Sequence, residues 1–383
     1  MRKLCIGLIV CMLIPSPCYS LSDSTLASKV DTSGVDAMYR VDHETEAQGR
    51  LSTQTLKKLW DAKLASGDPK AIQYDPNDPA FIRYDPLWDR GTTKFIHAIA
   101  REKAVIGEFE YIPGPAEVVP TFTREDWWLK KREQDLISDM NINGRRYDVQ
   151  TNYQPILNHS MMFVAHAKSI DDAINNRHRL DADRIHDFLT FQQNNNCVGY
   201  FNSFEAGASI KQFHIQMAPR DDFPGSLKEE KFEIEVCEYQ THSASEGVII
   251  KRSLRDNPRT VVSFESDDKH ALAQQAGDFA QRIQAENIPH NVVFVEGKVY
   301  FVLRRFEDSY EFKKRARALG GLEICCGVFT FYQEAELDEW HEDENVISEF
   351  LRYFALSHDV LDKLLEGDRN EDASSLTVLY KAA

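Results

Sequence analysis

The sequence predicts an α+β fold in which a unit of antiparallel sheet flanked by helices occurs twice, behind an N-terminal helical extension. Two regions, near residues 147–218 and near 248–331, each alternate strand-like segments with an intervening helical segment. The second region contains a hairpin pattern, with Asn291–Val295 and Val299–Arg304 flanking the turn Glu296-Gly297-Lys298. The repeated order supports a duplicated unit, although the two regions share too little sequence identity to prove one.

The segment before residue 145 predicts a helix, two irregular stretches and a second helix. Apolar residues recur at helical spacing in Thr53–Ala65 and again in Thr93–Ile106. Asp68–Trp88 is rich in Pro and Asp and is expected to be a loop, and Tyr111–Phe122 contains three prolines. We therefore expect helices separated by irregular chain in this part.

From residue 145 onward, alternation and short apolar runs predict strands separated by three amphipathic helices. The expected strands are Tyr147–Thr151, Ser160–His166, Cys197–Asn202, Lys211–Ala218, Phe232–Tyr239, Val248–Lys251, Thr260–Phe264 and the hairpin. The expected helices are Asp181–Gln193, Asp268–Glu286 and Val346–Leu365. Gly320-Gly321 leads into an apolar run that ends at Phe331.

These elements suggest four regions within the 383 residues. They are a signal peptide (1–20), a helical and irregular extension (21–144), a first half of the duplicated fold that carries the candidate site (145–265) and a second half (266–383). The first region has Arg2 and Lys3 before the apolar run Leu4–Ile14, with a cleavage point after Ser20. It predicts export to a periplasmic or secretory compartment. The alternative is a cytoplasmic protein that keeps this segment.

Charge and cysteine usage exclude several classes of function. The net charge of −16 argues against a general nucleic-acid or anionic-membrane surface, because the chain lacks excess Lys and Arg. A small anionic substrate remains allowed, since local backbone amides can bind phosphate. Cys197, Cys237, Cys325 and Cys326 have no zinc-ligand spacing and are expected to be buried thiols. No metal site is predicted.

The candidate functional residue is His214, in the run Gln212-Phe213-His214-Ile215-Gln216. On a strand, Gln212, His214 and Gln216 share one face, while Phe213 and Ile215 point into the core. A neutral imidazole can attack phosphorus with its own lone pair, and a glutamine amide can donate to a phosphoryl oxygen. A histidine on a strand is more often structural, however. A serine hydrolase is a poor interpretation, because the sequence has no Gly-x-Ser-x-Gly motif.

The loop before this strand completes the pattern. Ser203–Ser209 contains Gly207, whose small neighbours let a phosphate approach the backbone amides closely. The stretch from Gly199 through Gly207-Ala208-Ser209 to His214-Ile215-Gln216 resembles the diadenosine tetraphosphate (Ap4A) phosphorylase family, also called ATP adenylyltransferases. That family belongs to the histidine-triad (HIT)-like superfamily, with galactose-1-phosphate uridylyltransferase and the GDP-hexose phosphorylases. The resemblance extends loosely over nearly the whole chain after the signal peptide and implies a HIT-like fold.

The resemblance assigns a role to each matching position. It makes His214 the nucleophile and Gln216 a phosphate ligand. The wall around the phosphates would be Asn202, Ser203, Gly207, Ala208 and Ser209. Further nucleotide contacts would be Asn152, Asn291 and Arg304, the last as a charge partner for a distal phosphate. Two positions depart from the family pattern: Gln212 replaces a histidine, and the run Thr151-Asn152-Tyr153 lacks a lysine.

We therefore expect an enzyme that takes a nucleoside monophosphate from a dinucleoside polyphosphate and passes it to inorganic phosphate. No cofactor is required for the covalent step, although Mg²⁺ can accompany the substrate. The first alternative is a GDP-hexose phosphorylase, suggested by the missing lysine. The second is a nucleotide-binding protein without catalysis, suggested by Gln212. His159 and His166 are expected to be structural, and the sequence predicts no oligomeric state.

Overall fold

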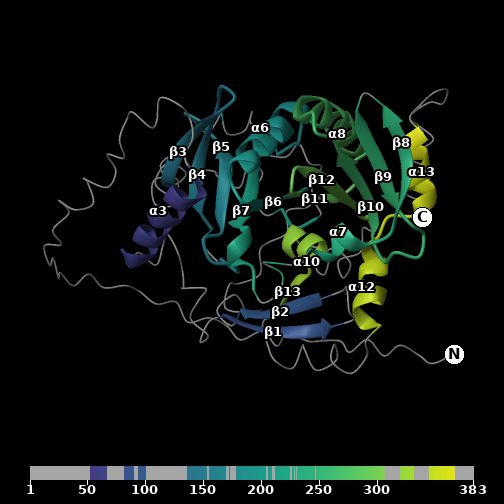
Figure 1. Ribbon diagram of the computed structural model, residues 1–383, viewed down its shortest axis with the longest axis horizontal. Coiled ribbons are helices and arrows are strands. Elements are labelled where there is room, and N and C mark those ends of the chain that lie inside the picture. The colour runs from purple at the N-terminus through teal and green to yellow at the C-terminus, as the bar shows by residue number, and fades with distance from the viewer. Residues whose placement is uncertain are drawn as a thin grey trace, which may run out of the picture. The chain divides into compact units, whose positions relative to one another are not determined.

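In the computed structural model the chain forms two units, Met1–Ala47 and Gln48–Ala383. The structure describes residues 52–66, 82–89, 94–100, 136–152, 155–169, 172, 178–203, 206–208, 212–224, 227, 229, 231–245, 247–306, 320–331 and 345–366. All described elements belong to the second unit (Figure 1). The predicted signal peptide, 1–20, and Tyr111–Phe122 lie outside the described residues. No helix in the described ranges is long and apolar enough to cross a membrane.

A ten-stranded sheet forms the centre of the described structure. Its first five strands are β3 (Leu136–Ile142), β4 (Arg145–Thr151), β5 (Met161–Ala165), β6 (Cys197–Asn202) and β7 (His214–Pro219). The other five are β8 (Tyr239–Ser245), β9 (Val248–Ser253), β10 (Thr260–Glu265), β11 (His290–Val295) and β12 (Lys298–Leu303). The order across the sheet is β3-β4-β5-β7-β6-β11-β12-β10-β9-β8, and every neighbouring pair is antiparallel.

This order confirms the predicted duplication. Among the named elements of the sheet and the helices packed on it, each half runs through three strands, one long helix and two more antiparallel strands, and these helices are α6 (Ala182–Gln193) and α8 (Lys269–Ala285). The second half repeats the strand order of the first, read from the opposite edge of the sheet. The halves join where β6 pairs with β11, with Asn202 opposite Asn291. Strands β8 to β10, which precede residue 266, therefore lie beyond β12 in the second half of the sheet.

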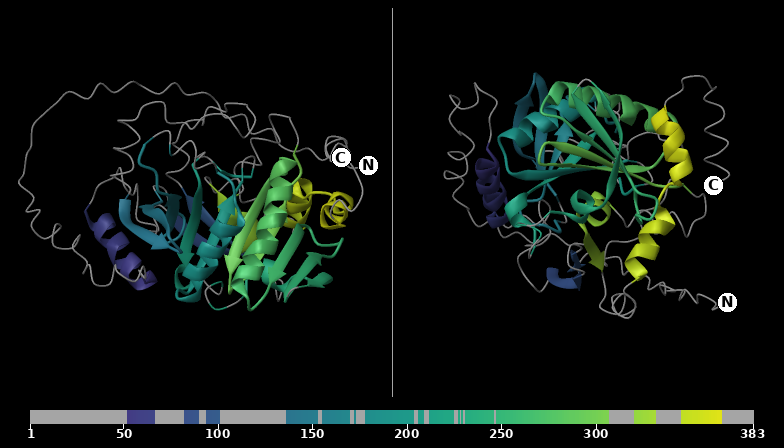
Figure 2. Two further views of the ribbon diagram at one scale, coloured as in Figure 1. Left: turned by 90° about the horizontal axis from the view of Figure 1, so that it is seen from above. Right: turned by 45° about the vertical axis from the view of Figure 1, so that its right-hand side comes forward.

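Two cores cover the two faces of this sheet. The helices α6 and α8 lie side by side on one face (Figures 1 and 2). Their apolar side chains pack against Phe163, Ile215 and Phe301 from the strands. The second core contains Tyr200 and Val293 from the sheet, together with the short helices α7 (Glu233–Val236) and α10 (Gly321–Cys326). Asn202, His214 and Asn291 alternate with residues of the first core and therefore lie on the face that carries this second core.

Two predictions for the N-terminal extension are wrong. Part of the expected loop Asp68–Trp88 forms strand β1 (Ile82–Asp89), and part of the expected helix Thr93–Ile106 forms β2 (Lys94–Ala100). These two strands make a separate sheet with β13 (Val328–Phe331), in which β2 pairs with both neighbours. The register shifts between Pro86 and Trp88, as expected where proline interrupts a strand at the edge of a sheet. Pairing with a distant segment therefore decided this conformation.

Two further predictions are corrected, and one apolar run without a predicted conformation is assigned its elements. The expected strand Phe232–Tyr239 begins as helix α7, because the Glu235 side chain accepts a 2.8 Å hydrogen bond from the backbone N–H of Phe232. The apolar run after Gly320 forms α10 and then β13, separated by Gly327. The expected helix Val346–Leu365 divides into α12 (Val346–Phe354) and α13 (His358–Glu366). The break between them coincides with a β-bridge from Ala355 to Arg304.

Candidate functional site

His214 is the first residue of β7 and is almost fully buried, with 4% of its surface exposed. Its strand neighbours Phe213, Ile215 and Met217 pack into the core beneath α6 and α8. His214 and the partly exposed Gln216 lie on the other face. The predicted alternation along this strand is therefore confirmed, and it separates the candidate nucleophile from the main core.

The ring of His214 is fixed by its own backbone. The Nδ1–H group donates a 2.9 Å hydrogen bond to the carbonyl oxygen of Gln212, which leaves the lone pair on Nε2. Burial lowers the pKa of His214, and the Gln212 carbonyl opposes this only in part. The imidazole is therefore neutral near neutral pH, which is the form that can act as a nucleophile.

Gln212, at the position where the resemblance places a histidine, fixes the segment just before β7. Its side chain is buried, and Nε2 donates a 2.8 Å hydrogen bond to the carbonyl oxygen of Ala165 at the end of β5. The backbone N–H of Ala165 in turn donates to the carbonyl oxygen of Phe213. The glutamine thus connects the two strands, and its carbonyl orients His214.

A second imidazole, missed by the sequence analysis, lies against the first. The ring of His178 stacks on that of His214, with centroids 4.5 Å apart and planes at 21°. His178 is buried, and its Nε2–H donates a 2.6 Å hydrogen bond to the carbonyl oxygen of Asn202. Burial, and then the proximity of His214, lower its pKa well below the ordinary value. No sequence spacing could have found it, because it lies 36 residues before His214 in a connecting segment.

Three predicted residues meet at the junction of the two halves. The Nδ2 group of Asn291 donates to Oδ1 of Asn202 at 2.9 Å and to the carbonyl oxygen of Ala206 at 2.7 Å. Arg304 is buried, and its Nη1 lies 3.5 Å from Oδ1 of Asn291. The sequence prediction that both halves contribute to one site is consistent with this chain of contacts.

Helix α10 closes this network from the second core. The backbone N–H of Gly321 donates a 2.6 Å hydrogen bond to Oδ1 of Asn202. A Cβ atom at Gly321 would lie 3.0 Å from Cβ of Tyr200 and 3.1 Å from Oδ1 of Asn202, so glycine permits this close approach. Oδ1 of Asn202 therefore accepts two internal hydrogen bonds, and Asn202 organises the junction.

The glycine loop folds back on Ser203. Its carbonyl oxygen accepts hydrogen bonds from the amides of Ala206 and Ala208, and Gly207 has a positive φ of 99°. The Oγ atom of Ser203 accepts a 2.7 Å hydrogen bond from the backbone N–H of His290. The amide of Ala208 is therefore engaged within the loop. Ser209 lies outside the described residues.

Asn152 is not adjacent to His214. In the sheet register, His214 lies opposite Val164 and, one strand further, Asp148. Asn152 is four residues beyond Asp148, which is roughly 13 Å along the strand at about 3.3 Å per residue. One phosphate group cannot contact both His214 and Asn152. Asn152 can contact only a more distant part of a nucleotide bound at His214.

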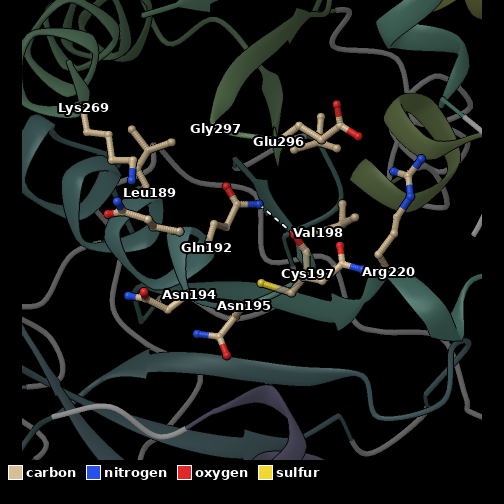
Figure 3. A pocket seen from close by; sticks show the side chains of 13 residues that line it. Leu189, Gln192, Asn194, Asn195, Cys197, Val198, Arg220, Lys269, Glu296 and Gly297 are labelled. Carbon is tan, nitrogen blue, oxygen red and sulfur yellow. Dashed lines mark hydrogen bonds between the residues drawn. The ribbon is translucent and has the colours of Figure 1, made fainter. Parts of the chain in front are cut away.

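A pocket of about 510 Å³ opens at the other end of β6, beside Cys197 (Figure 3). Amide side chains after α6 line it together with Lys269, Arg220 and Glu296. Cys197 pairs with Pro219, five residues along β7 from His214, which is roughly 17 Å. This pocket is separate from the His214 site. Among the described residues, no group of His, Cys, Asp or Glu is arranged to hold a metal ion.

The other predicted histidines and cysteines have structural surroundings. His159 contacts carboxylate oxygens of both Asp61 and Asp222, and His166 contacts Asp148 at 2.8 Å. Cys197, Cys325 and Cys326 are buried, Cys237 is half-buried, and all four are free thiols. The predicted thiols are thus confirmed, with Cys237 less enclosed than expected.

The fold of this chain is similar to that of solved structures. Neither a protein-family model nor a curated protein sequence matches the chain. Its fold is similar to the crystal structure of yeast Ap4A phosphorylase Apa2 in complex with Ap4A, with a TM-score of 0.53 and 15% identity over 79% of this chain and 97% of that one. Another crystal structure of Apa2 gives a TM-score of 0.50, with the same identity and coverage. At this identity the likeness establishes the fold alone, and the predicted α+β architecture built on antiparallel sheet is confirmed.

Proposed function

We propose that the protein is a nucleotidyltransferase that cleaves a dinucleoside polyphosphate through a nucleotidyl-histidine intermediate, with inorganic phosphate as the acceptor. The observation that carries the proposal is the hydrogen bond from Nδ1 of His214 to the Gln212 carbonyl, which leaves the Nε2 lone pair for attack in a buried site. The fold it shares with a phosphorylase crystallised with Ap4A supports this substrate class.

In the first step, Nε2 of His214 attacks the α-phosphorus of the substrate. A P–N bond forms as the P–O bond to the leaving polyphosphate breaks, and its electron pair stays on the leaving oxygen. The substituted ring becomes cationic, and its Nδ1–H remains bonded to the Gln212 carbonyl, which stabilises that charge. No base is needed, because the neutral ring gives up no proton.

In the second step, an oxygen of inorganic phosphate attacks the same phosphorus. A new P–O bond forms, the P–N bond breaks, and its electron pair returns to Nε2 of His214. The product is a nucleoside diphosphate. The amide of Gln216 lies on the same strand face and would donate to a phosphoryl oxygen in both steps. Arg304, in the second half, would balance the charge of a more distal phosphate. Mg²⁺ would enter only with the substrate.

Trapping of the intermediate tests the proposal. Purified protein is incubated with Ap4A labelled in its α-phosphates, without phosphate, and the denatured protein is examined for label that is stable to alkali and labile to acid. We expect about one adduct per chain, located on His214, and none in His214→Ala. His270→Ala is the matched control, because this histidine is exposed on α8. An active wild-type protein without such an adduct would contradict the mechanism.

A substrate panel separates the alternatives. Phosphorolysis of Ap4A is compared with that of GDP-glucose at equal concentrations. Faster turnover of Ap4A supports the proposed substrate class, and faster turnover of GDP-glucose would assign the same chemistry to a nucleoside-diphosphate hexose. Nucleotide binding without turnover of either, unchanged by His214→Ala, would identify a binding protein.

A further inference from the structure

We propose that His178 is a positioning residue for the nucleophile, holding the ring of His214 in the orientation from which Nε2 attacks phosphorus. The inference rests on the proposed function. It follows from three contacts of His178, with His214, Phe201 and Asn202, which together connect the nucleophile to the end of the neighbouring strand.

The first contact is the stack on His214. The two rings lie 4.5 Å apart at 21°, so the face of His178 blocks rotation of the His214 ring about its Cβ–Cγ bond. The backbone carbonyl of Gln212 holds one edge of the His214 ring through Nδ1. A hydrogen bond at one edge fixes the tautomer, and the stack fixes the plane. Both are needed to aim a lone pair.

The second contact supports His178 from the neighbouring strand. Its ring stacks on Phe201 of β6, with centroids 4.6 Å apart and planes at 25°. Phe201 is fully buried in the core with α6 and α8. The buried Phe201 ring therefore restricts movement of the His178 ring, and the His178 ring in turn restricts movement of the His214 ring.

The third contact fixes the orientation of His178 and relates it to the phosphate wall. Its Nε2–H donates a 2.6 Å hydrogen bond to the carbonyl oxygen of Asn202. The side chain of the same asparagine joins the two halves through Asn291 and Gly321. Asn202 thus connects His178, which stacks on the nucleophile, to the junction where the predicted phosphate contacts meet. A misplacement of about 1 Å can cost on the order of 100-fold in rate.

His178 also shields the His214 ring from solvent. Burial is the largest cause of the lowered pKa of His214, and the His178 ring covers one face of it. Within the described ranges, the charged group acting on His178 is Arg184 of α6, which also lowers the His178 pKa. The Arg184 guanidinium lies 4.0 Å from the ring centroid of Phe213. Removing the His178 ring would admit water and raise the pKa of His214 towards its ordinary value.

The experiment compares His178→Phe with His178→Ala. Phenylalanine keeps a flat ring between Phe201 and His214, whereas alanine removes it. The rate of adduct formation on His214 is measured in single turnovers with labelled Ap4A between pH 4.5 and 8. We expect His178→Ala to be 10- to 100-fold slower at neutral pH, with its acid limb at higher pH and with the Kd for Ap4A within about threefold of wild type. We expect His178→Phe to stay within about threefold of the wild-type rate and to keep the wild-type acid limb.

The outcomes are distinguishable. A folded His178→Ala protein that forms the adduct at the wild-type rate, with an unchanged acid limb, would overturn the inference alone. A wild-type protein that forms no adduct would overturn the proposed function and this inference with it. If alanine prevents folding, His178→Leu replaces it, since leucine fills the space without a ring. Equal adduct rates for the phenylalanine and leucine variants would then contradict positioning by a ring stack.

Discussion

The Nδ1–H group of His214 donates a hydrogen bond to the carbonyl oxygen of Gln212, two residues earlier on the same chain. This contact uses the backbone of Gln212, so it does not depend on the identity of that side chain. The side chain has a separate task, because its amide binds the carbonyl oxygen of Ala165. A glutamine at the position where the resemblance places a histidine is therefore compatible with the proposed role of His214 as the nucleophile.

The first prediction concerns Gln212 itself. Gln212→His should keep phosphorolysis within about threefold of wild type, because an imidazole N–H can still donate to the Ala165 carbonyl. Gln212→Ala leaves that buried carbonyl without this donor and should lower the free energy of unfolding by about 1–3 kcal/mol. Urea denaturation and kcat for Ap4A measure the two effects. Equal loss of activity in both variants would show that the glutamine amide has a direct role in binding substrate.

The second prediction uses His290, a buried imidazole outside the proposed chemistry. Burial lowers its pKa to about 4, against the weaker opposing effect of the Ile288 carbonyl. The unfolded chain binds a proton as pH falls through about 6.5, whereas the native state does not until about pH 4. Stability is therefore fully present above pH 6.5 and is lost as pH falls towards 4, by about 3 kcal/mol from this residue.

His290→Phe should reduce this acid sensitivity by a similar amount, because the new ring cannot bind a proton. The variant keeps an aromatic ring near Phe201, whose centroid lies 6.0 Å from that of His290. The measurement is the difference in unfolding free energy between pH 7.5 and pH 4. His270→Ala, on the surface of α8, is the control and should behave as wild type. An unchanged pH dependence in His290→Phe would show that His290 binds its proton with the same pKa in the native and unfolded states, against this prediction.

Local periodicity predicted the parts of the fold in which a strand or helix carries its own pattern. The hairpin β11–β12, the helices α6 and α8 and the alternation around His214 are of this kind. The strands β1 and β2 were missed, because β2 pairs with β13, more than 200 residues away, and β1 pairs in turn with β2. Helix α7 was taken for a strand, because one glutamate side chain caps it. Local patterns contain neither kind of information.

The candidate site divides in the same way. His214 and Gln216 followed from strand alternation, whereas Asn202, Asn291 and Arg304 followed from the resemblance. Their meeting at the pairing of β6 with β11 depends on the topology of the whole sheet. His178 was missed, because stacking between rings from separate segments leaves no periodic trace in a sequence. The contacts that bring the site residues together from different elements could therefore be identified only from the structure.

The third prediction tests the close approach of α10 to the sheet. In Gly321→Ala the new methyl group would press on Tyr200 and Asn202, at 3.0 and 3.1 Å. Overpacking of this kind costs about 1–3 kcal/mol, and the shift would also lengthen the hydrogen bond to Asn202. We expect a lower urea midpoint together with slower phosphorolysis. Glu349→Ala, on the exposed side of α12, should change stability by less than about 0.5 kcal/mol. A wild-type midpoint in Gly321→Ala would show that α10 can move at little cost.

The last prediction concerns the attachment of helix α3 (Thr53–Ala65). Asp222 accepts hydrogen bonds from Lys57 of this helix at 2.9 Å and from His159 at 2.8 Å. Because Asp222 is mostly buried, Asp222→Asn should weaken the attachment by about 1 kcal/mol. Asp61 contacts the same histidine but is 61% exposed, so Asp61→Asn should have a smaller effect. Hydrogen exchange measures both: residues 53–65 should exchange faster in Asp222→Asn, while α8 keeps its wild-type protection. Exchange at the wild-type rate in both variants would show that the ion pairs do not hold the helix, which leaves the packing of the buried Trp60 side chain.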